Sequence, residues 1–268
     1  MTTASLAPRP ATRWVIGGTV GVLFAIPLLS TLLYTLIDHN TGQFTVAHWA
    51  GLFDSANQHI LKPIWTGLGN SLVLALLTVL IVLLLLAPTM IVINLRMPQL
   101  RRGFEFLVLL PISIPAIVLV VGLSPIYLVI GHSLGTGAWT LAFAYGITVL
   151  PFAFRSIQAS IDAIDLRTLS EASRASGAGW PATVLLVLVP NLREGLLAAS
   201  LISTAVVLGE FTIASLLNRQ VFQTSLLVVS KMDGYASSMF TLLSLAFAFG
   251  LLIVIGRLGR ISARKDAS

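Results

Sequence analysis

The chain has 268 residues, of which 56% are hydrophobic and only 10% are charged; its formal net charge is +6 and it has no cysteine. Soluble domains carry about 25% charged residues, so the composition indicates a multi-pass membrane protein and excludes a sizeable soluble domain. The positive charge, which would suggest a nucleic-acid partner in a soluble protein, is expected here to reflect orientation in the bilayer, and the lack of cysteine excludes disulfide and thiolate chemistry.

Six apolar runs predict an all-α integral membrane protein with six transmembrane helices. A helix needs about 20 mostly apolar residues to cross the hydrocarbon core, and an open strand would leave backbone groups unpaired in lipid. The first run is too long for the core of a cleaved signal peptide and is interpreted as a retained span. The third run contains three prolines, which predict kinks. The predicted spans are Trp14–Ile37, Leu72–Leu95, Leu107–Tyr127, Leu134–Phe154, Leu196–Leu217 and Ala236–Gly256.

Basic residues predict the orientation of these spans, because cytoplasmic loops of membrane proteins carry an excess of Lys and Arg. On one side lie only Lys62, Arg219 and Lys231. The other side carries Arg9, Arg13, Arg96, Arg101, Arg102, Arg155, Arg167, Arg174, Arg193, Arg257, Arg260, Arg264 and Lys265. Both termini are therefore predicted to be cytoplasmic, with tails 1–13 and 257–268 flanking a six-helix domain at 14–256 in the inner or plasma membrane.

This orientation places three loops outside, at residues 38–71, 128–133 and 218–235. The third contains the apolar patch Leu226–Val229, which is too short to span and is expected to be re-entrant or interfacial. The longest inner loop is 155–195.

The inner loop begins with two competing helix-start signals. Thr168 and Glu171 have the spacing of a capping box, in which Thr168 would cap the helix and Glu171 would bond back to it. Asp165 is a competing cap one turn earlier. Either start predicts a short helix that continues through Ser176.

A turn and a second helix are expected to follow. Gly177 and Gly179 end the first helix and permit positive φ, Pro181 suits the first turn of the second helix, and Pro190 is expected to break it. Small residues leave one side of the first helix smooth, namely Ala172, Ser173, Ala175 and Ser176. Such a helix–turn–helix is shaped to lie in a groove of a partner.

The spacing within this loop resembles a family motif. Glu171-Ala172-Ser173, three residues, Gly177, nine residues and Val187-Leu188-Val189-Pro190 are similar to the "EAA" loop of binding-protein-dependent ABC importer permeases. Ser replaces the second Ala of that motif, and Val replaces its Ile and its Leu. Asn70-Ser71-Leu72 and Asn191 to Gly195 also resemble the family, and the similarity covers about residues 60–256.

The resemblance implies that this loop is the coupling helix, which sits in a cleft of a separate ATPase subunit. Glu171 would pair with a basic residue of that ATPase and Gly177 would form the turn. The alternative is that Glu171 only caps its own helix. The predicted coupling residues are Thr168, Leu169, Glu171, Ala172, Arg174 and Gly177.

The chain contains no G-x-x-x-x-G-K-[ST] motif for cradling phosphates, so ATP and Mg are expected to be used by a partner, and no cofactor or metal is expected in this chain. The implied partners are an ABC ATPase dimer, a second permease subunit that is usually distinct in this branch, an extracytoplasmic solute-binding protein and the lipid bilayer. No nucleic acid is expected.

Glu210 lies within the fifth predicted span, where a carboxylate costs at least ~2–3 kcal/mol unless it faces a cavity or a partner. Leu208-Gly209-Glu210-Phe211 resembles a stretch in permeases for polyamines, ferric iron and molybdate. Glu210 either lines the translocation path or fixes packing through an inter-helix hydrogen bond. Gly209 is expected to let another helix approach closely.

Four residues of this span share helical spacing and could form a stripe along a translocation path: Ser200, Ser203, Val207 and Glu210. Ordinary polar packing between helices is the alternative.

Loop 218–235 resembles the polyamine-type branch of these permeases, at the place where they meet the substrate-binding protein. The resemblance implies the permease subunit of an ATP-driven importer for a small polar solute such as spermidine or putrescine. Aminoethylphosphonate, ferric iron or another oxyanion is the alternative cargo. An ATPase-independent secondary transporter or channel would give no reason for the Glu171 loop spacing. A membrane enzyme would need a catalytic constellation, and the sequence offers none.

Overall fold

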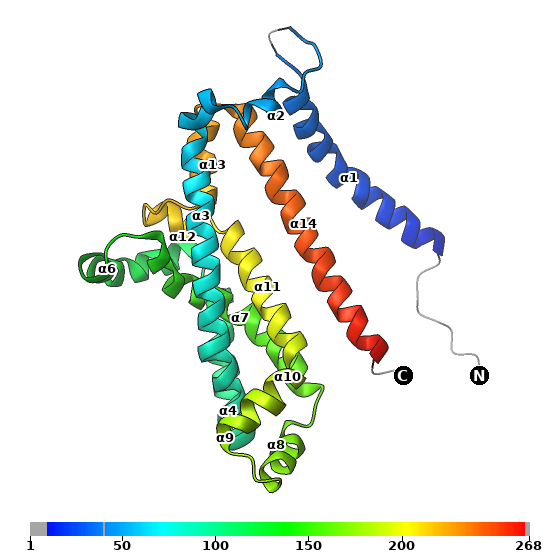
Figure 1. The fold of residues 1–268 in the computed structure, drawn as a ribbon, viewed down its shortest axis with the longest axis vertical. Helices are drawn as coiled ribbons and strands as arrows, with labels where there is room; N and C mark the ends of the chain where they lie inside the picture. The colour runs from blue at the N-terminus through cyan, green and yellow to red at the C-terminus, as the bar shows by residue number, and fades with distance from the viewer. Residues whose placement is uncertain (1–9, 40, 266–268) are drawn as a thin grey trace. The chain divides into compact units, whose positions relative to one another are not determined.

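The computed structural model describes residues 10–39 and 41–265, and within these ranges it is helical apart from turns and one isolated bridge between Ile37 and Phe44 (Figure 1). The predicted all-α class is confirmed. Arg9 of the predicted N-terminal tail lies outside the described residues. So do the side chains of Arg13, Arg257, Arg260, Arg264 and Lys265.

Within the described ranges, four helices are long and apolar enough to cross a membrane, or five if one bent pair counts as a single span. They are Trp14–Leu36, Ser55–Arg96, Ala116–Leu134, Ala138–Asp162 and the pair Trp180–Asn191 with Arg193–Gly209. The sixth predicted span falls on α14 (Gly234–Lys265), whose described apolar part, Gly234–Gly250, is shorter. The count of six spans therefore stays a prediction. Helix α14 also continues into the segment expected as the C-terminal tail.

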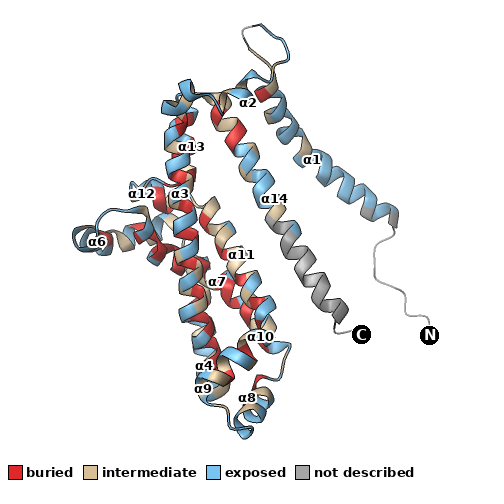
Figure 2. Ribbon diagram, in the orientation of Figure 1, coloured by how far each residue is buried: buried red, intermediate tan, exposed pale blue. Residues whose placement is uncertain are grey.

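The chain forms two compact units. Unit 1 comprises the residues up to Leu61 together with Val228–Ala246. It holds α1 (Pro10–Leu36), α2 (Ala47–Gly51), η1 (Ser55–Asn57) and the start of α14. The side chains of α1 are exposed along almost all of its described length (Figure 2), as expected for a helix that meets lipid or another chain.

Aromatic side chains join the end of α1 and the loop that follows it to the start of α14. The ring of Tyr235 stacks on that of His48 at 3.8 Å and on that of Tyr34 at 4.9 Å. The hydroxyl of Tyr235 lies 3.0 Å from Nδ1 of His39. His39 and His48 are therefore engaged with tyrosines, a pairing that their spacing in the sequence does not indicate.

Unit 2 comprises Lys62–Leu227 and the residues from Phe247 on. Its longest element is an unbroken helix formed by α3 (Gln58–Ile81), the π-helical η2 (Val82–Leu86) and α4 (Ala87–Arg96). The second predicted span, Leu72–Leu95, lies inside this helix. The helix starts well before Leu72 because apolar residues such as Leu61 and Ile64 are buried in its first turns.

The third predicted span, Leu107–Tyr127, is wrong as a single kinked helix. After η3 (Pro98–Leu100), the chain forms α5 (Arg101–Leu109), η4 (Leu110–Ser113) and α6 (Ala116–Leu134). Ile114 is extended, with φ −99° and ψ 120°, because the residue before a proline, here Pro115, is driven out of the helical region. The helix is therefore broken at this point.

The loop predicted at 128–133 and the start of the fourth span at Leu134 are also wrong, because α6 continues to Leu134. The turn follows at Gly135, which has φ +84°. The chain re-enters helix through η5 (Ala138–Leu141) and α7 (Ala142–Asp162). A glycine can take this positive φ without the steric strain that a Cβ would cause, and so it ends α6.

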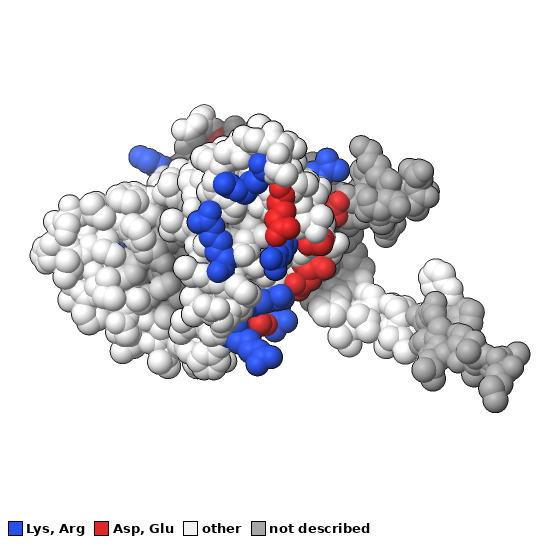
Figure 3. Space-filling view, turned by 90° about the horizontal axis from the view of Figure 1, so that it is seen from below, with Lys and Arg blue, Asp and Glu red and all other residues white. Residues whose placement is uncertain are grey.

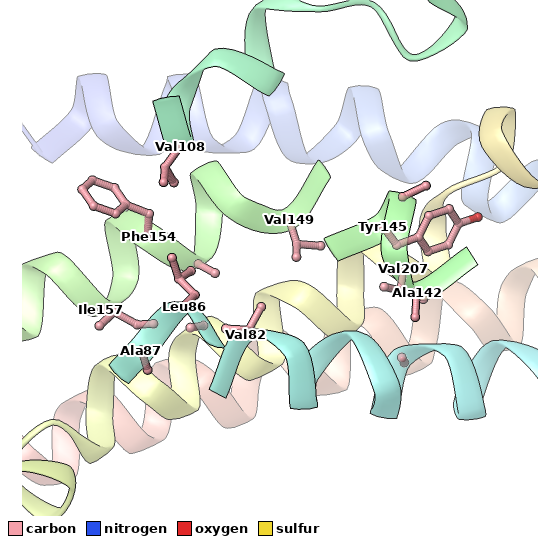
Figure 4. Close-up of a cluster of buried hydrophobic side chains, with 14 of the residues drawn as sticks. Val82, Leu86, Ala87, Val108, Ala142, Tyr145, Val149, Phe154, Ile157 and Val207 are labelled. Atoms are coloured by element: carbon pink, nitrogen blue, oxygen red, sulfur yellow. The ribbon is translucent and has the colours of Figure 1, made fainter. Parts of the chain in front are cut away.

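The core of unit 2 lies where α7 packs along α11 (Arg193–Gly209) and against η2. Figure 4 shows part of this cluster, in which Tyr145 and Val149 of α7 lie near Val82 and Val207. A Cβ at Gly195 would lie 2.8 Å from the carbonyl oxygen of Ser156, so only glycine allows α11 and α7 to come this close.

The close approach predicted at Gly209 is not seen within this chain. No atom lies within 4 Å of the position that a Cβ at Gly209 would take. Gly195, at the other end of α11, has the role that Gly209 was expected to have.

Candidate functional site

The first arm of the loop at 155–195 is α8 (Leu166–Ala175), and Asp165 is its N-cap. The carboxylate of Asp165 accepts the backbone N–H of Thr168 at 3.1 Å and the Thr168 hydroxyl at 2.6 Å. These bonds hold the pKa of Asp165 below its ordinary value. The predicted Thr168 cap is wrong, because Asp165 already occupies the non-helical position and Thr168 lies inside the first turn.

Glu171 forms no capping box. One of its oxygens accepts from Nε of Arg167 at 2.8 Å, across one helical turn. This hydrogen bond raises the pKa of Arg167. The side chains remain 82% and 67% exposed for Arg167 and Glu171, so the pair stays accessible to a partner. The alternative in which Glu171 caps its own helix is therefore wrong.

Helix α8 has one buried face and one exposed face. Leu166 and Ser170 are buried, and Leu169 and Ser173 are half-buried on the same face, against η6 and α4. Four of the predicted coupling residues lie on the exposed face: Thr168, Glu171, Ala172 and Arg174. Leu169 instead packs into the core of its own chain.

Gly177 forms the turn after α8 and has φ +87°, as predicted. The N–H of Ala178 donates to the carbonyl of Ser173, and the N–H of Gly177 donates to that of Arg174. These two bonds make a Schellman motif, the usual end of a helix at a left-handed glycine. Gly179 has φ −69°, so the positive φ predicted there is wrong.

The second arm runs through α9 (Trp180–Ala182), the π-helical η6 (Thr183–Leu188) and α10 (Val189–Asn191). Pro181 lies in the first turn of α9, as predicted. The helix does not break at Pro190, which lies in the first turn of α10, where its missing N–H is tolerated. The 74° bend comes two residues later, at Leu192, before α11.

Two side-chain contacts hold this second arm in place. The hydroxyls of Ser173 and Thr183 are 3.0 Å apart, and Thr183 is fully buried. The guanidinium carbon of Arg96 lies 4.5 Å from the centroid of the Trp180 ring. Seen from the end of unit 2 that carries α8, α9 and the last turn of α4, charged side chains gather on one face (Figure 3).

Glu210 marks a second break in the helices of unit 2. Helix α11 ends at Gly209, Glu210 is extended, and α12 (Thr212–Leu216) follows. The fifth predicted span is therefore wrong as one continuous helix to Leu217. The Glu210 carboxylate accepts the Tyr145 hydroxyl at 2.7 Å and the N–H of Ile213 at 3.0 and 3.1 Å. These hydrogen bonds favour the alternative in which Glu210 fixes the packing of helices rather than lining a translocation path.

The predicted stripe on α11 faces the interior of unit 2. Ser203 is fully buried, and Val207 is only 2% exposed and lies near Ala142 and Tyr145 in Figure 4. The Ser200 hydroxyl donates to the carbonyl of Leu196, within its own helix. These contacts favour the packing alternative, and a role in a translocation path stays a prediction.

The segment after the second break is tied to α3 by side-chain bonds to backbone. Asn70 donates to the carbonyl of Gln220 at 2.8 Å, and the N–H of Phe222, the first residue of α13 (Phe222–Ser230), donates to the Ser71 hydroxyl at 2.9 Å. Asn70 and Ser71 therefore hold the segment around Gln220 and Phe222 against α3. The roles of Tyr145 and Trp180 could not be predicted from the sequence, because each depends on a partner distant in the chain. The contact of Thr183 with Ser173 crosses the glycine turn and also has no local signature.

Comparison with known families matches residues 89–260, well over half of the chain, to a model described as "Binding-protein-dependent transport system inner membrane component". The matched range contains both arms of the loop around Gly177 and the break at Glu210. No curated protein matches the chain. The chain belongs to the family of binding-protein-dependent transport system inner membrane components.

Proposed function

We propose that the chain is the translocation subunit of an ATP-driven importer and that the exposed face of α8 docks on a separate ABC ATPase. The single observation that carries this proposal is the division of α8 into two faces. Its apolar face packs on its own chain, whereas Thr168, Glu171, Ala172 and Arg174 are left exposed beside a rigid glycine turn. A helix so presented offers charge and small side chains to a groove in a partner.

The rest of the assembly follows from this docking. Two ATPase subunits would bind ATP and Mg on the cytoplasmic side, where both termini of this chain would also lie. A second permease subunit would complete the path, and a solute-binding protein would meet the outer face. The chain itself would bind no cofactor and catalyse no reaction. ATP binding and binding-protein docking would jointly favour the outward-open state.

Spermidine or putrescine is the cargo we propose, on the resemblance of Leu208 to Phe211 and of loop 218–235 to polyamine-type permeases. Glu210 adds no free carboxylate for a cationic cargo, because Tyr145 and Ile213 already donate to it. Aminoethylphosphonate, ferric iron or another oxyanion is the alternative cargo of the same permease.

Charge reversal at Glu171 tests the docking. An affinity-tagged chain is purified from its own membranes and assayed for ATP hydrolysis, which a chain without a phosphate-cradling motif cannot supply. We expect Glu171→Lys to retain at most about one tenth of the wild-type ATPase activity, since losing one partner of an interfacial charge pair costs about 2–5 kcal/mol. Glu105→Lys is the matched control, because Glu105 is exposed on α5, outside the loop, and should behave as wild type.

Equal ATP hydrolysis in the preparations of wild type and Glu171→Lys would contradict the docking proposal. The same variants test the cargo through uptake of labelled spermidine and putrescine in cells that lack the chain and any redundant system. Rescue by wild type and by Glu105→Lys, but not by Glu171→Lys, supports polyamine cargo. Uptake that does not depend on the chain rejects polyamines and leaves the docking result standing.

A further inference from the structure

Arg96 and Trp180 make a contact between two parts of the chain that are far apart in sequence. Arg96 is the last residue of α4, and Trp180 is the first residue of α9, directly after the glycine turn. The 4.5 Å distance from the guanidinium carbon to the ring centroid is that of a cation–π contact. Arginine is suited to this role because its planar guanidinium stacks on aromatic faces.

Among the described residues, the Arg96 guanidinium takes part in neither ion pair and lies against the Trp180 ring. The ion pairs among the described residues join Arg101 to Asp162 and Arg167 to Glu171, and neither includes Arg96. Trp180 is fixed from its own side, because Gly179 before it is extended and Pro181 after it restricts the backbone. The backbone that carries the ring is therefore restricted on both sides, and the ring itself lies against Arg96.

The contact between Ser173 and Thr183 joins α8 to the second arm. Their hydroxyls are 3.0 Å apart, and Thr183 is fully buried at the start of η6. Leu166 and Leu169 of α8 belong to the same packed core as Leu188 of η6. Since packed interiors transmit displacement rather than absorb it, α8 and the second arm form one body.

We propose that Arg96 and Trp180 are positioning residues that carry displacements of α8 to α4. From α4 the displacement enters the unbroken helix that runs back through η2, whose residues Val82 and Leu86 are buried in the core of unit 2. This route is additional to the direct packing of α8 against α4 and to the backbone connections of α8 to α7 and of α10 to α11. It rests on the proposed docking of α8 on an ATPase, and such coupling is carried by contiguous packed contacts.

Because this chain has no cysteine of its own, an introduced cysteine is its single labelling site, and the complex without that cysteine gives the background from the partner chains. Thr89→Cys places a single label on the exposed side of α4, one to two turns from Arg96. The tagged complex, with its ATPase, is labelled with an environment-sensitive fluorophore, and the emission change caused by ATP with vanadate is measured. We expect a change in the otherwise wild-type chain. Arg96→Gln should reduce it about two- to five-fold, in line with the modest strength of an exposed cation–π contact.

Conservative variants separate positioning from folding. Trp180→Phe keeps an aromatic face and should retain most of the emission change. Arg96→Lys keeps the charge but not the planar group that stacks, so its emission change should lie between those of the wild type and Arg96→Gln. Trp180→Leu should lose it to the same extent as Arg96→Gln, while ATP hydrolysis that copurifies with the chain stays at the wild-type level. An undiminished change in Arg96→Gln, or no change in the wild-type chain, would overturn the proposal.

A cross-link tests whether the two arms move as one body. Ser173→Cys with Thr183→Cys, combined with the label on α4, should form a disulfide and leave the emission change intact. Loss of the change on cross-linking, restored by reduction, would show that the arms move independently and would overturn the route. Failure of the proposed function gives a different result, namely a wild-type preparation without ATP hydrolysis or one that Glu171→Lys does not alter.

Discussion

Glu171 and Glu210 are both carboxylates beside breaks in the helices of unit 2, yet the chain uses them in opposite ways. Glu171 lies on the exposed face of α8, and its partner is Arg167 one turn away on the same surface. Glu210 accepts the Tyr145 hydroxyl and the N–H of Ile213, and so joins α7, α11 and α12. One carboxylate remains available to a partner, whereas the other holds its own fold together.

The difference shows that the hydrogen-bond partners of a carboxylate in an apolar chain indicate whether it serves the fold or the recognition of a partner. A carboxylate whose hydrogen bonds are all made internally is part of the architecture, because removing it leaves buried donors unpaired. A carboxylate bonded only to an exposed neighbour contributes little to stability and is free to recognise another protein. The comparison predicts that changes near Glu210 lower stability, whereas changes of the exposed side chains on α8 affect function.

The largest expected effect is that of Glu210→Ala on stability. The substitution removes the acceptor of two donors, the Tyr145 hydroxyl and the N–H of Ile213, and each unsatisfied buried donor costs about 1–3 kcal/mol. We expect a total loss of about 2–4 kcal/mol, measured as a lower midpoint of thermal unfolding for the purified chain. Glu210→Gln, which keeps one acceptor oxygen, should lose less.

Glu171→Ala is the matched change at the other break and should leave the unfolding midpoint where it is in the wild type. Its effect should be confined to the ATP hydrolysis that copurifies with the chain. The comparison would fail if Glu210→Ala unfolded at the wild-type temperature, or if Glu171→Ala lowered the midpoint as much.

The loop around Gly177 could be predicted from the sequence because its rules are local. A glycine after a short helix and a proline at the start of the next act within a few residues. The choice between Asp165 and Thr168 as the cap could not be settled, because both have suitable side chains and spacing. Only the backbone angles decide which one lies outside the helix, and the structure selects Asp165.

Span boundaries and the role of Glu210 could not be predicted because they depend on distant contacts. The residues from Leu110 to Pro115 are apolar apart from one serine, so hydropathy does not indicate that Ile114 is extended and that the helix breaks there. Glu210 is 65 residues from Tyr145, and no local pattern indicates that the two side chains meet. A carboxylate within an apolar run indicated that a partner was needed, but not which one.

A smaller effect on stability is expected at Gly177, the glycine of the turn after α8, and it distinguishes Gly177 from Gly209 at the end of α11. Gly177 has φ +87°, and a Cβ in this left-handed region costs about 1–2 kcal/mol, although no atom lies within 4 Å to obstruct it. We expect Gly177→Ala to speed trypsin cleavage at Arg174 by about five- to thirty-fold, measured on the purified chain without the ATPase, which would cover Arg174 in the proposed complex. Gly177→Asn should have a smaller effect, because asparagine tolerates this conformation better than alanine.

Gly209 is the matched control at the second break. It is not among the described residues with positive φ, and a Cβ there meets nothing within 4 Å. Gly209→Ala should therefore leave the unfolding midpoint unchanged or raise it slightly, since alanine is the better helix former. Equal losses of stability from Gly177→Ala and Gly209→Ala would contradict the conformational role of Gly177.

The smallest expected effect is a pH dependence at the start of α8. The hydrogen bonds from Thr168 hold the pKa of Asp165 below its ordinary value of 3.8. A carboxylate whose pKa is lower in the folded state stabilises that state above its ordinary pKa and loses this contribution as the pH falls through the lowered value. The cap should therefore be fully formed from pH 7 down to about pH 4 and should weaken below that.

The amide of Thr168 reports directly on this cap, because its N–H donates to Asp165. Its hydrogen-exchange protection, corrected for the intrinsic rate, should stay level to about pH 4 and then fall. Asp165→Asn keeps a capping oxygen that does not titrate, so its protection should not change with pH, whereas Asp165→Ala should be poorly protected throughout. If Asp165→Asn showed the same pH profile as the wild type, the loss of protection at low pH would have to come from the titration of another group, and the cap would not be its cause.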